Sequence, residues 1–185
     1  MYEVDLKSGL MADARQLKSP HQDERPDPSD ISLLVIHGIS LPPGVFGGDW
    51  IDDLFLGQLD PEAHPYFKEI EGMRVSSHLL IRRDGALTQY VPFHHRAWHA
   101  GVSCFDGRQA CNDYAIGIEL EGADDTQYED AQYDTLIAVA DELKKAYPRI
   151  TSQRIVGHSD IAPGRKTDPG ECFDWSRLGT VRTTG

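Results

Sequence analysis

Residues 32–37 read SLLVIH, an apolar and β-branched run that stops at a histidine followed by Gly38. A run of this length and composition predicts a buried β-strand that ends in a turn. Two later runs predict further strands, AIGIELEG at 115–122 and RIVGH at 154–158. Two of the three strands end at a histidine. Strand ends that open into loops are where α/β proteins place their sites, so these histidines become candidates.

The remaining secondary structure follows from turn residues and helical periodicity. Residues 76–85 and 86–92 are strand-like and flank Asp84-Gly85, which predicts a hairpin. Residues 129–147 place apolar side chains at helical spacing, with acidic residues first and lysines last, which predicts a long helix. Shorter helices are expected near 49–56 and 61–70. This order of elements, in 185 residues, predicts a mixed α/β fold, a single domain with a central mixed β-sheet flanked by helices.

Composition restricts the partners and the location. The formal net charge is -12 with a pI near 4.9, which argues against binding to nucleic acid or to an anionic membrane surface. No apolar run is long enough to span a bilayer, and the N-terminus carries no basic region followed by an apolar one. The three cysteines are scattered and suit reduced thiols. A cytoplasmic location is therefore expected.

Two segments are predicted to be irregular. Residues 18–30 are polar and rich in proline, which predicts an ordered surface arm or linker and excludes a helix. Residues 38–73 follow directly after His37 and contain most of the glycine and proline turn signals. A long irregular segment in this position is usually functional, as a cleft wall or lid. The alternative is a loop that only covers one edge of the sheet.

Three residues could hold a metal ion. His37 and His158 end predicted strands, and Asp168 lies on the loop that follows His158. A mononuclear catalytic zinc site needs three protein ligands and one open position for water. The pattern is not His-Glu-x-x-His, in which one helix fixes two ligands. Spacing alone therefore leaves two structural histidines as the alternative.

Other titratable residues have competing explanations. Glu119 and Glu121 lie two residues apart on one predicted strand, so both point to one face and either could act as a base. His78 is expected to be a buried, hydrogen-bonded histidine, and His99 could line a cleft. His94 and His95 are expected to be exposed. The cysteines are expected to be inert, since no motif places Cys104, Cys111 or Cys172 beside a ligand-like histidine.

A family resemblance adds to these inferences. Five segments occur in the order and with the spacing of the AmpD-type N-acetylmuramoyl-L-alanine amidases, which they resemble: SLLVIHGISLPPGVFGG, RVSSHLLIRRDG, RAWHAGVSCFDGR, CNDYAIGIELEG and GHSDIAPGRKTDPGECFDW. The resemblance runs from about residue 15 to about residue 178. It implies one amidase domain over residues 1–185, with the fold of the zinc amidases that are related to phage T7 lysozyme and the peptidoglycan recognition proteins.

The resemblance also implies site residues and a reaction. It makes His37, His158 and Asp168 the ligands of one zinc ion per chain. It makes Glu119 and Lys166 the catalytic residues, and it places Arg74 and Trp98 along the substrate cleft. The implied reaction is hydrolysis of the amide bond between the lactyl group of (anhydro-)N-acetylmuramic acid and L-alanine, on anhydromuropeptides recovered in cytoplasmic cell-wall recycling. An anhydromuropeptide is thus the expected partner.

Three departures and two alternatives accompany the resemblance. Gly38 stands where a polar amide is expected, Ser159 where cysteine is more usual, and Ala110 where a basic residue often precedes Cys-Asn-Asp. None is a ligand, so these changes affect contacts to peptide or sugar more than the chemistry. The first alternative is a non-catalytic module that binds peptidoglycan fragments, and the complete ligand set argues against it. The second is a Cys–His hydrolase, which no motif supports.

Overall fold

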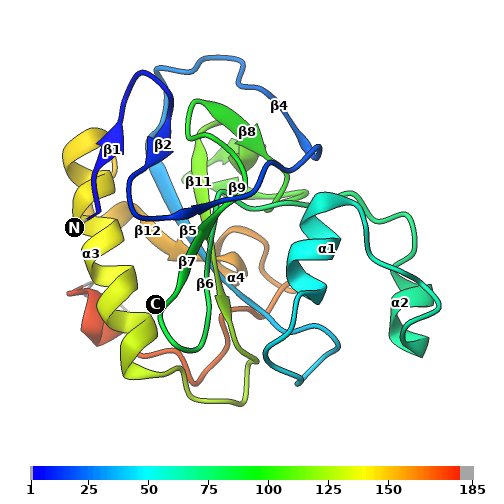
Figure 1. The fold of residues 1–185 in the computed structure, drawn as a ribbon. Helices are drawn as coiled ribbons and strands as arrows, with labels where there is room; N and C mark the ends of the chain where they lie inside the picture. The colour runs from blue at the N-terminus through cyan, green and yellow to red at the C-terminus, as the bar shows by residue number, and fades with distance from the viewer. Residues whose placement is uncertain (1, 180–185) are drawn as a thin grey trace.

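The computed structural model describes residues 2–179, and at its centre lies a six-stranded mixed sheet with the order β12-β5-β11-β6-β7-β3 (Figure 1). Its strands, in chain order, are β3 (Arg15–Gln16), β5 (Leu33–Ile39), β6 (Leu79–Ile81), β7 (Leu87–Gln89), β11 (Ala115–Glu121) and β12 (Ile155–Gly157). The strands β12, β5, β11 and β6 are mutually parallel, and β7 turns back antiparallel to β6. The expected mixed α/β fold with a central mixed sheet is confirmed.

Strand alternation separates the two faces of the sheet. One face packs Leu34 and Ile36 of β5 and Ile116 and Ile118 of β11 into a core with helix α3 (Asp130–Ala146). The other residues of these strands, such as Leu33, point to the opposite face. His37 and Glu119 continue that second series, so the pleat places them on the face away from α3. Figure 1 shows α3 on one side of the sheet and α1 and α2 on the other.

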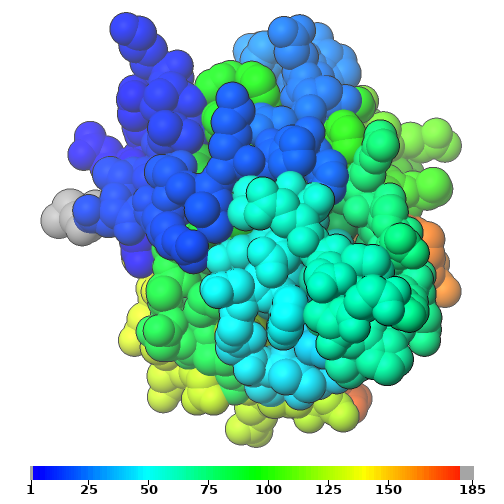
Figure 2. Space-filling model, turned by 45° about the vertical axis from the view of Figure 1, so that its right-hand side comes forward, coloured from blue at the N-terminus to red at the C-terminus, as the bar shows by residue number. Residues whose placement is uncertain are grey.

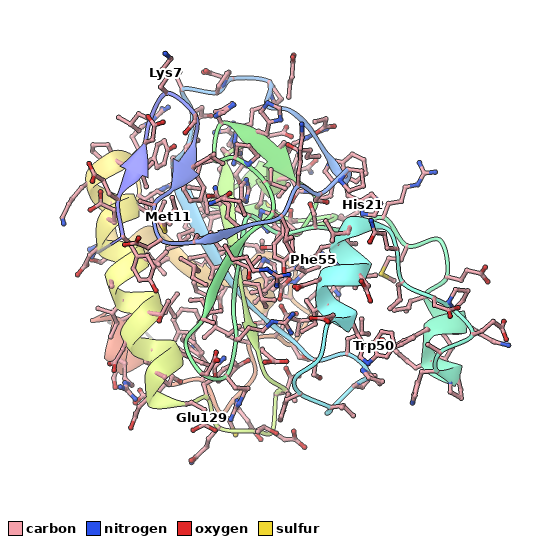
Figure 3. All side chains as sticks on the ribbon, viewed as in Figure 1. Lys7, Met11, His21, Trp50, Phe55 and Glu129 are labelled. Atoms are coloured by element: carbon pink, nitrogen blue, oxygen red, sulfur yellow. The ribbon has the colours of Figure 1, made fainter. Side chains whose placement is uncertain are left out.

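The chain after β5 builds a separate layer over the second face. It contains α1 (Trp50–Leu56) and α2 (Pro65–Glu69), close to the predicted short helices. Phe55 of α1 is 1% exposed and lies on the side of the helix that faces the sheet, whereas Trp50 is only half-buried (Figure 3). In the space-filling view, residues of this layer, coloured cyan to green, cover much of the face that comes forward (Figure 2).

Short elements complete the described chain. The small strands are β1 (Val4–Asp5), β2 (Leu10–Met11), β4 (Gln22–Glu24), β8 (His95–Ala97), β9 (Cys104–Phe105) and β10 (Arg108–Gln109). The short helices are η1 (Cys111–Asp113), η2 (Ser152–Arg154), α4 (His158–Ile161) and η3 (Trp175–Leu178). The pairs β1–β2, β4–β8 and β9–β10 are all antiparallel. Within residues 2–179, no helix combines the length and the apolar character needed to cross a membrane.

The structure corrects some predicted boundaries. The strand β5 does not stop at His37 but continues to Ile39, because β11 pairs with it over its whole length. His158 does not end a strand; it begins α4, directly after β12. Residues 94–113, for which the turn residues and periodicity above predict no regular element, contain three short strands. The last element of the described chain is the short helix η3.

Candidate metal centre and active site

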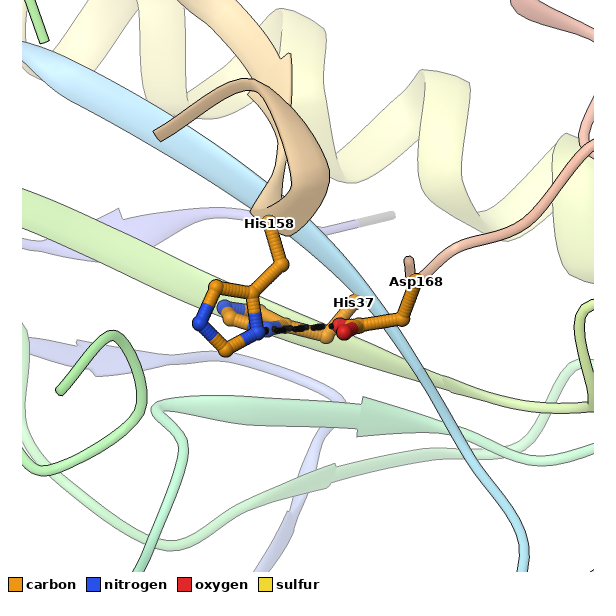
Figure 4. Close-up of side chains that lie close together, drawn as sticks. All are labelled: His37, His158 and Asp168. Carbon is orange, nitrogen blue, oxygen red and sulfur yellow. Dashed lines mark hydrogen bonds and ion pairs between the residues drawn. The ribbon is translucent and has the colours of Figure 1, made fainter. Parts of the chain in front are cut away.

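Three side chains from separate parts of the chain meet at one end of the sheet. Since β12 pairs with β5, with Gly157 opposite Ile36, the next residue on each strand places His158 beside His37. Asp168 reaches them from the loop after α4. The Nδ1 atoms of the two histidines are 3.0 Å apart. Oδ2 of Asp168 is 3.2 Å from Nδ1 of His37 and 3.1 Å from Nδ1 of His158 (Figure 4). We call these three residues the metal corner.

The outer nitrogen of each histidine fixes its tautomer. Nε2 of His158 lies 3.0 Å from the carbonyl oxygen of Ala100, which can only accept, so the proton is on Nε2 and Nδ1 keeps its lone pair. Nε2 of His37 lies 2.9 Å from Nδ1 of His99. This contact joins the two rings through one N–H, and His37 keeps the lone pair of Nδ1 for a metal when His37 is the donor. In each ring Nδ1 faces the metal corner while Nε2 is held by a second contact, as in most metal-ligating histidines.

The donor set fits a zinc ion. Two imidazole nitrogens and one carboxylate oxygen form a triangle whose edges approach the roughly 3.3 Å expected between tetrahedral ligands about 2.0 Å from zinc. Burial lowers the pKa of His37 to about 4, so its ring is neutral at physiological pH and available as a ligand. Although burial of its carboxylate opposes this, contacts with His158 and His37 lower the pKa of Asp168 below its usual range. The His37 ring and the Asp168 carboxylate therefore carry the protonation states that metal binding requires.

The metal corner opens into a cleft of about 810 Å³. Its lining includes His37, His158, Glu119, Lys166 and Asp168. Residues 40–75, which we call the cleft wall, contribute much of the remaining lining. The wall residues that line the cleft are Ser40, Leu41, Pro43, Gly44, Leu54, Phe55, Tyr66, Ile70, Met73 and Val75. A cleft that combines apolar surface with convergent polar groups is the usual form of a small-molecule site.

Glu119 lies beside His37 and carries an unpartnered oxygen. It pairs with His37 in the register of β11 and β5, and it is 8% exposed. Its Oε2 is buried and has no hydrogen-bond partner among the described residues. Burial and the nearby Asp168 carboxylate raise the pKa of Glu119 well above its usual range, and Lys166 opposes the shift. A carboxyl group with a raised pKa in a cleft can take up and release a proton.

Glu121 points to the same face but has different partners. It is 2% exposed, accepts the N–H of Gly47 at 2.6 Å, and forms an ion pair with Arg82 at 3.3 Å. These bonds tie the cleft wall to β11. Of the two glutamates that the sequence left open, Glu121 is thus committed to structural contacts and does not line the cleft.

The other predicted site residues are distributed unevenly. Lys166 is exposed and lines the cleft, and Trp98 is half-buried there. The Trp98 ring stacks on His21 at 5.9 Å, and its Nε1 donates to Asp23 at 3.1 Å. Arg74 is exposed and lines a separate small cavity of about 160 Å³ next to the wall. The structure therefore places Lys166 and Trp98 in the lining of the cleft that contains the metal corner, and Arg74 in the lining of a separate cavity.

Three further histidines, His78, His94 and His95, lie outside the metal corner. His78 is fully buried and accepts the N–H of Gly117, as expected for a satisfied core histidine. The prediction that His94 and His95 are exposed is wrong, since both are half-buried. The reason is that β4 pairs with β8, with Glu24 opposite His95, so the predicted surface arm at residues 18–30 covers this part of the chain.

Two side-chain contacts were not predicted from the sequence. His99, expected only as a possible lining residue, also contacts the metal ligand His37. Arg25 is 4% exposed and places one guanidinium nitrogen 3.0 Å from Nε2 of His78 and 2.7 Å from the carbonyl oxygen of Ala115. Nothing in the local sequence marks either contact, because each joins segments that are distant along the chain.

Comparison with known proteins shows which family the chain belongs to. The family model for N-acetylmuramoyl-L-alanine amidase matches residues 27–171. The 1,6-anhydro-N-acetylmuramyl-L-alanine amidase AmpD of Haemophilus influenzae is 61% identical over 173 residues, 94% of each chain. A crystal structure of a selenomethionine derivative of AmpD superposes with a TM-score of 0.91 at 58% identity, covering 95% of this chain and 97% of that one.

A more distant structure contains a ligand. It is the N-acetylmuramyl-L-alanine amidase AmiD from Escherichia coli, in complex with the substrate anhydro-N-acetylmuramic acid-L-Ala-D-γ-Glu-L-Lys. This structure has a TM-score of 0.60 and 30% identity, and the match covers 95% of this chain and 64% of that one.

Proposed function

The chain belongs to the N-acetylmuramoyl-L-alanine amidase family, and from this premise we propose that the metal corner is the zinc site of a muropeptide amidase. The protein is an amidase that hydrolyses the amide bond between N-acetylmuramic acid and L-alanine. The proposal adds the residues and the ion. His37, His158 and Asp168 hold one zinc ion per chain, Glu119 transfers the proton, and Lys166 stabilises the negative charge of the reaction.

Each proposed role follows from the position of its side chain. A zinc ion in this corner supplies a Lewis acid that polarises the amide carbonyl and makes a water molecule more acidic. Glu119, with its unpartnered Oε2, takes the proton of the attacking water and passes it to the leaving amine of L-alanine. Lys166, an exposed cation on the rim, stabilises the negative charge that builds on the carbonyl oxygen.

The proposed substrate is an anhydromuropeptide. Relatives are named for 1,6-anhydro-N-acetylmuramyl-L-alanine, and AmiD was captured with such a peptide. The cleft of about 810 Å³ has room for a substrate of this class. We propose that Trp98 packs against the substrate within the cleft. Arg74, placed outside, would reach only a distal part of the peptide.

We also propose that the protein acts in the cytoplasm on fragments of cell-wall turnover, and that residues 1–185 form one domain with its core at about 15–178. The three free cysteines, none of which is paired, favour a reducing compartment. Cell fractionation would test the location, and limited proteolysis the domain. An early cut that released two stable fragments would contradict a single domain.

One observation carries the proposal over a non-catalytic binding module. The three donor atoms approach to 3.0–3.2 Å with lone pairs directed at one another, and a carboxylate oxygen without a partner lies beside them. Such an arrangement is unfavourable unless a cation occupies it, since buried acceptors need a partner. A module that only binds fragments has no use for it.

The test combines metal content with a muropeptide digest. Purified protein should contain about one zinc ion per chain. It should release free peptide from anhydromuropeptide, lose this activity to a strong chelator, and regain it on addition of zinc. Asp168→Ala should lose both zinc and activity, whereas Asp141→Ala, which breaks an exposed ion pair with Lys144 on α3, should retain zinc. Full activity of rigorously metal-free protein would overturn the proposal.

A further inference from the structure

A tyrosine fills a space that two glycines leave beside the metal corner. Tyr128 lies in the loop between β11 and α3 and is 7% exposed. A Cβ atom on Gly38, next to His37, would come closer than 3.0 Å to the Tyr128 hydroxyl oxygen. A Cβ atom on Gly122 would come equally close to the Tyr128 ring. Neither glycine can therefore carry a side chain while Tyr128 keeps its place.

The Tyr128 hydroxyl group reaches the loop that carries Asp168. It donates a hydrogen bond of 2.9 Å to the carbonyl oxygen of Pro169. The Tyr128 ring cannot swing away easily, because it packs against Phe173 at 5.4 Å and Tyr133 at 6.4 Å. The hydroxyl thus fixes the backbone one residue after a metal ligand.

Asp168 depends on such bonds more than the other two ligands do. His37 and His158 belong to a strand and a helix, whose own hydrogen bonds set their positions. Asp168 comes from irregular chain, where tertiary contacts must place the backbone. One such contact is the N–H of Ser159, which donates to the Asp168 carbonyl oxygen at 3.0 Å. The Tyr128–Pro169 bond is the second.

We infer that Tyr128 is a positioning residue for the Asp168 carboxylate, and that Gly38 is glycine because the Tyr128 hydroxyl occupies its side-chain space. This inference rests on the proposed zinc site. It also changes the meaning of Gly38: the missing side chain is a requirement of the packing around Asp168 rather than only a lost contact to substrate. Contacts to the outer side of metal ligands typically contribute 10- to 100-fold in metal affinity.

The first test removes the hydroxyl alone. Tyr128→Phe keeps the ring, and its dissociation constant for Zn²⁺, measured by competition with a chromogenic chelator, should rise about 10-fold. Tyr133→Phe is the matched control. It belongs to the same aromatic cluster, but its hydroxyl accepts the N–H of Asp174 at 2.7 Å and does not reach the Asp168 loop. The dissociation constant of Tyr133→Phe for Zn²⁺ should stay within about 2-fold of that of the unchanged protein.

The second test uses the steric conflict. Gly38→Ala pushes its methyl group into the Tyr128 hydroxyl and should weaken zinc binding at least as much as Tyr128→Phe. In the Tyr128→Phe background the oxygen is gone, so adding Gly38→Ala should cost only about 2-fold more. Residues in contact show such non-additivity. A purely structural loss, or a direct effect of the methyl group on His37, would not be relieved by removing the hydroxyl.

The outcomes separate the two levels of inference. If the unchanged protein binds no zinc, the proposed function fails. If it binds zinc tightly and Tyr128→Phe binds equally tightly, the zinc site stands and the role of Tyr128 is overturned. An equal cost of Gly38→Ala in both backgrounds would overturn the explanation of Gly38. If Gly38→Ala does not fold, the comparison of Tyr128→Phe with Tyr133→Phe still decides the role of the hydroxyl.

Discussion

The metal corner and the cleft wall face the same cavity but are held in place by different means. In the corner, His37 is 1% exposed and His158 is 4% exposed, and Nε2 of each ring is held by a further contact. The wall, residues 40–75, is mostly irregular and turns repeatedly through glycines with positive φ, such as Gly47 and Gly57. A paired strand and a helix thus place the two histidines of the corner, whereas a long irregular segment shapes the cleft.

The wall is nevertheless attached at buried points, two of which involve carboxylates. Asp52 of α1 is 3% exposed and accepts bonds from Arg82 at 2.8 Å, from Arg15 at 2.9 Å and from the Tyr90 hydroxyl. Glu121 binds Gly47 as described above. The comparison teaches that the metal corner needs each of its side chains placed by strand pairing, by a helix or by a tied loop, and that the wall needs only enough attachment to keep its general position.

The largest expected effect tests the chemistry of the corner. Glu119→Gln keeps the shape of the side chain but removes the basic oxygen, so turnover should fall by roughly 10²- to 10⁴-fold, as for loss of a general base. Zinc content and muropeptide binding should be retained. Glu121→Gln, two residues away on the same face, is the control and should lose much less. Similar losses in both variants, or loss of zinc from Glu119→Gln, would remove Glu119 from its role.

The next effect tests the attachment of the wall. Asp52→Ala removes the acceptor of the Tyr90 hydroxyl and one of the two carboxylate partners of Arg82, so the free energy of unfolding should fall by about 3 kcal/mol. Glu62→Ala breaks an exposed ion pair with Lys68 in the same segment and should cost less than about 1 kcal/mol. Urea denaturation of both variants measures the difference. Equal costs would mean that the wall is not anchored through Asp52.

Burial of His37 predicts a pH dependence of the metal-free protein. The pKa of His37 is about 4 in the folded state and about 6.5 in an unfolded chain, so between these values only the unfolded state binds the proton. Stability should therefore fall as the pH drops from about 6.5 to 4, by on the order of 2–3 kcal/mol. The lowered pKa values of His78 and His99, both caused mainly by burial, act in the same direction.

Two variants test the contribution of His37 to this pH dependence, in protein from which a chelator has removed the metal. His37→Asn should flatten the change in unfolding free energy between pH 6.5 and 4. His64→Asn, which alters an exposed ring of the wall, should leave the slope unchanged. If the His37→Asn protein lost stability on acidification as steeply as the unchanged protein, buried His37 would not be the cause.

A smaller effect concerns motion. Backbone amides of the wall should exchange with deuterium faster than those of β5 and β11, because few of them belong to regular hydrogen-bonded elements. Hydrogen exchange followed by mass spectrometry would show this, and bound muropeptide should slow exchange in the wall more than in the strands. Uniform protection across wall and strands would exclude a mobile wall.

The smallest effect is expected outside both regions. Cys104 is exposed, Cys111 is buried against Tyr114, and Cys172 is half-buried, and none of them lines the cleft. A triple serine variant that folds and binds zinc should keep its turnover within about 2-fold, as expected for thiols that take no part in the chemistry. A large loss of turnover in such a variant would revive a cysteine-based mechanism.

Sequence and structure agree best where a local pattern has one solution. The run SLLVIH could only be a buried strand, and the helix at 130–146 followed from its periodicity and end charges. The turn at Asp84-Gly85 gave the hairpin of β6 and β7. Boundaries were less certain: β5 extends to Ile39 because a neighbouring strand continues to pair with it, which no local pattern reveals.

The sequence by itself determined the strands, the long helix and, through family resemblance, the residues of the candidate site. Only the tertiary structure decided which of the two glutamates, Glu119 or Glu121, has an oxygen available in the cleft, that Arg74 does not line the cleft, and why position 38 is glycine. The physical reason is that each of these depends on partners far along the chain: Glu121 meets Gly47 and Arg82, and Gly38 meets Tyr128. Periodicity and composition indicate which side of a segment faces water and which faces a hydrophobic core. They do not show which other segment packs beside it.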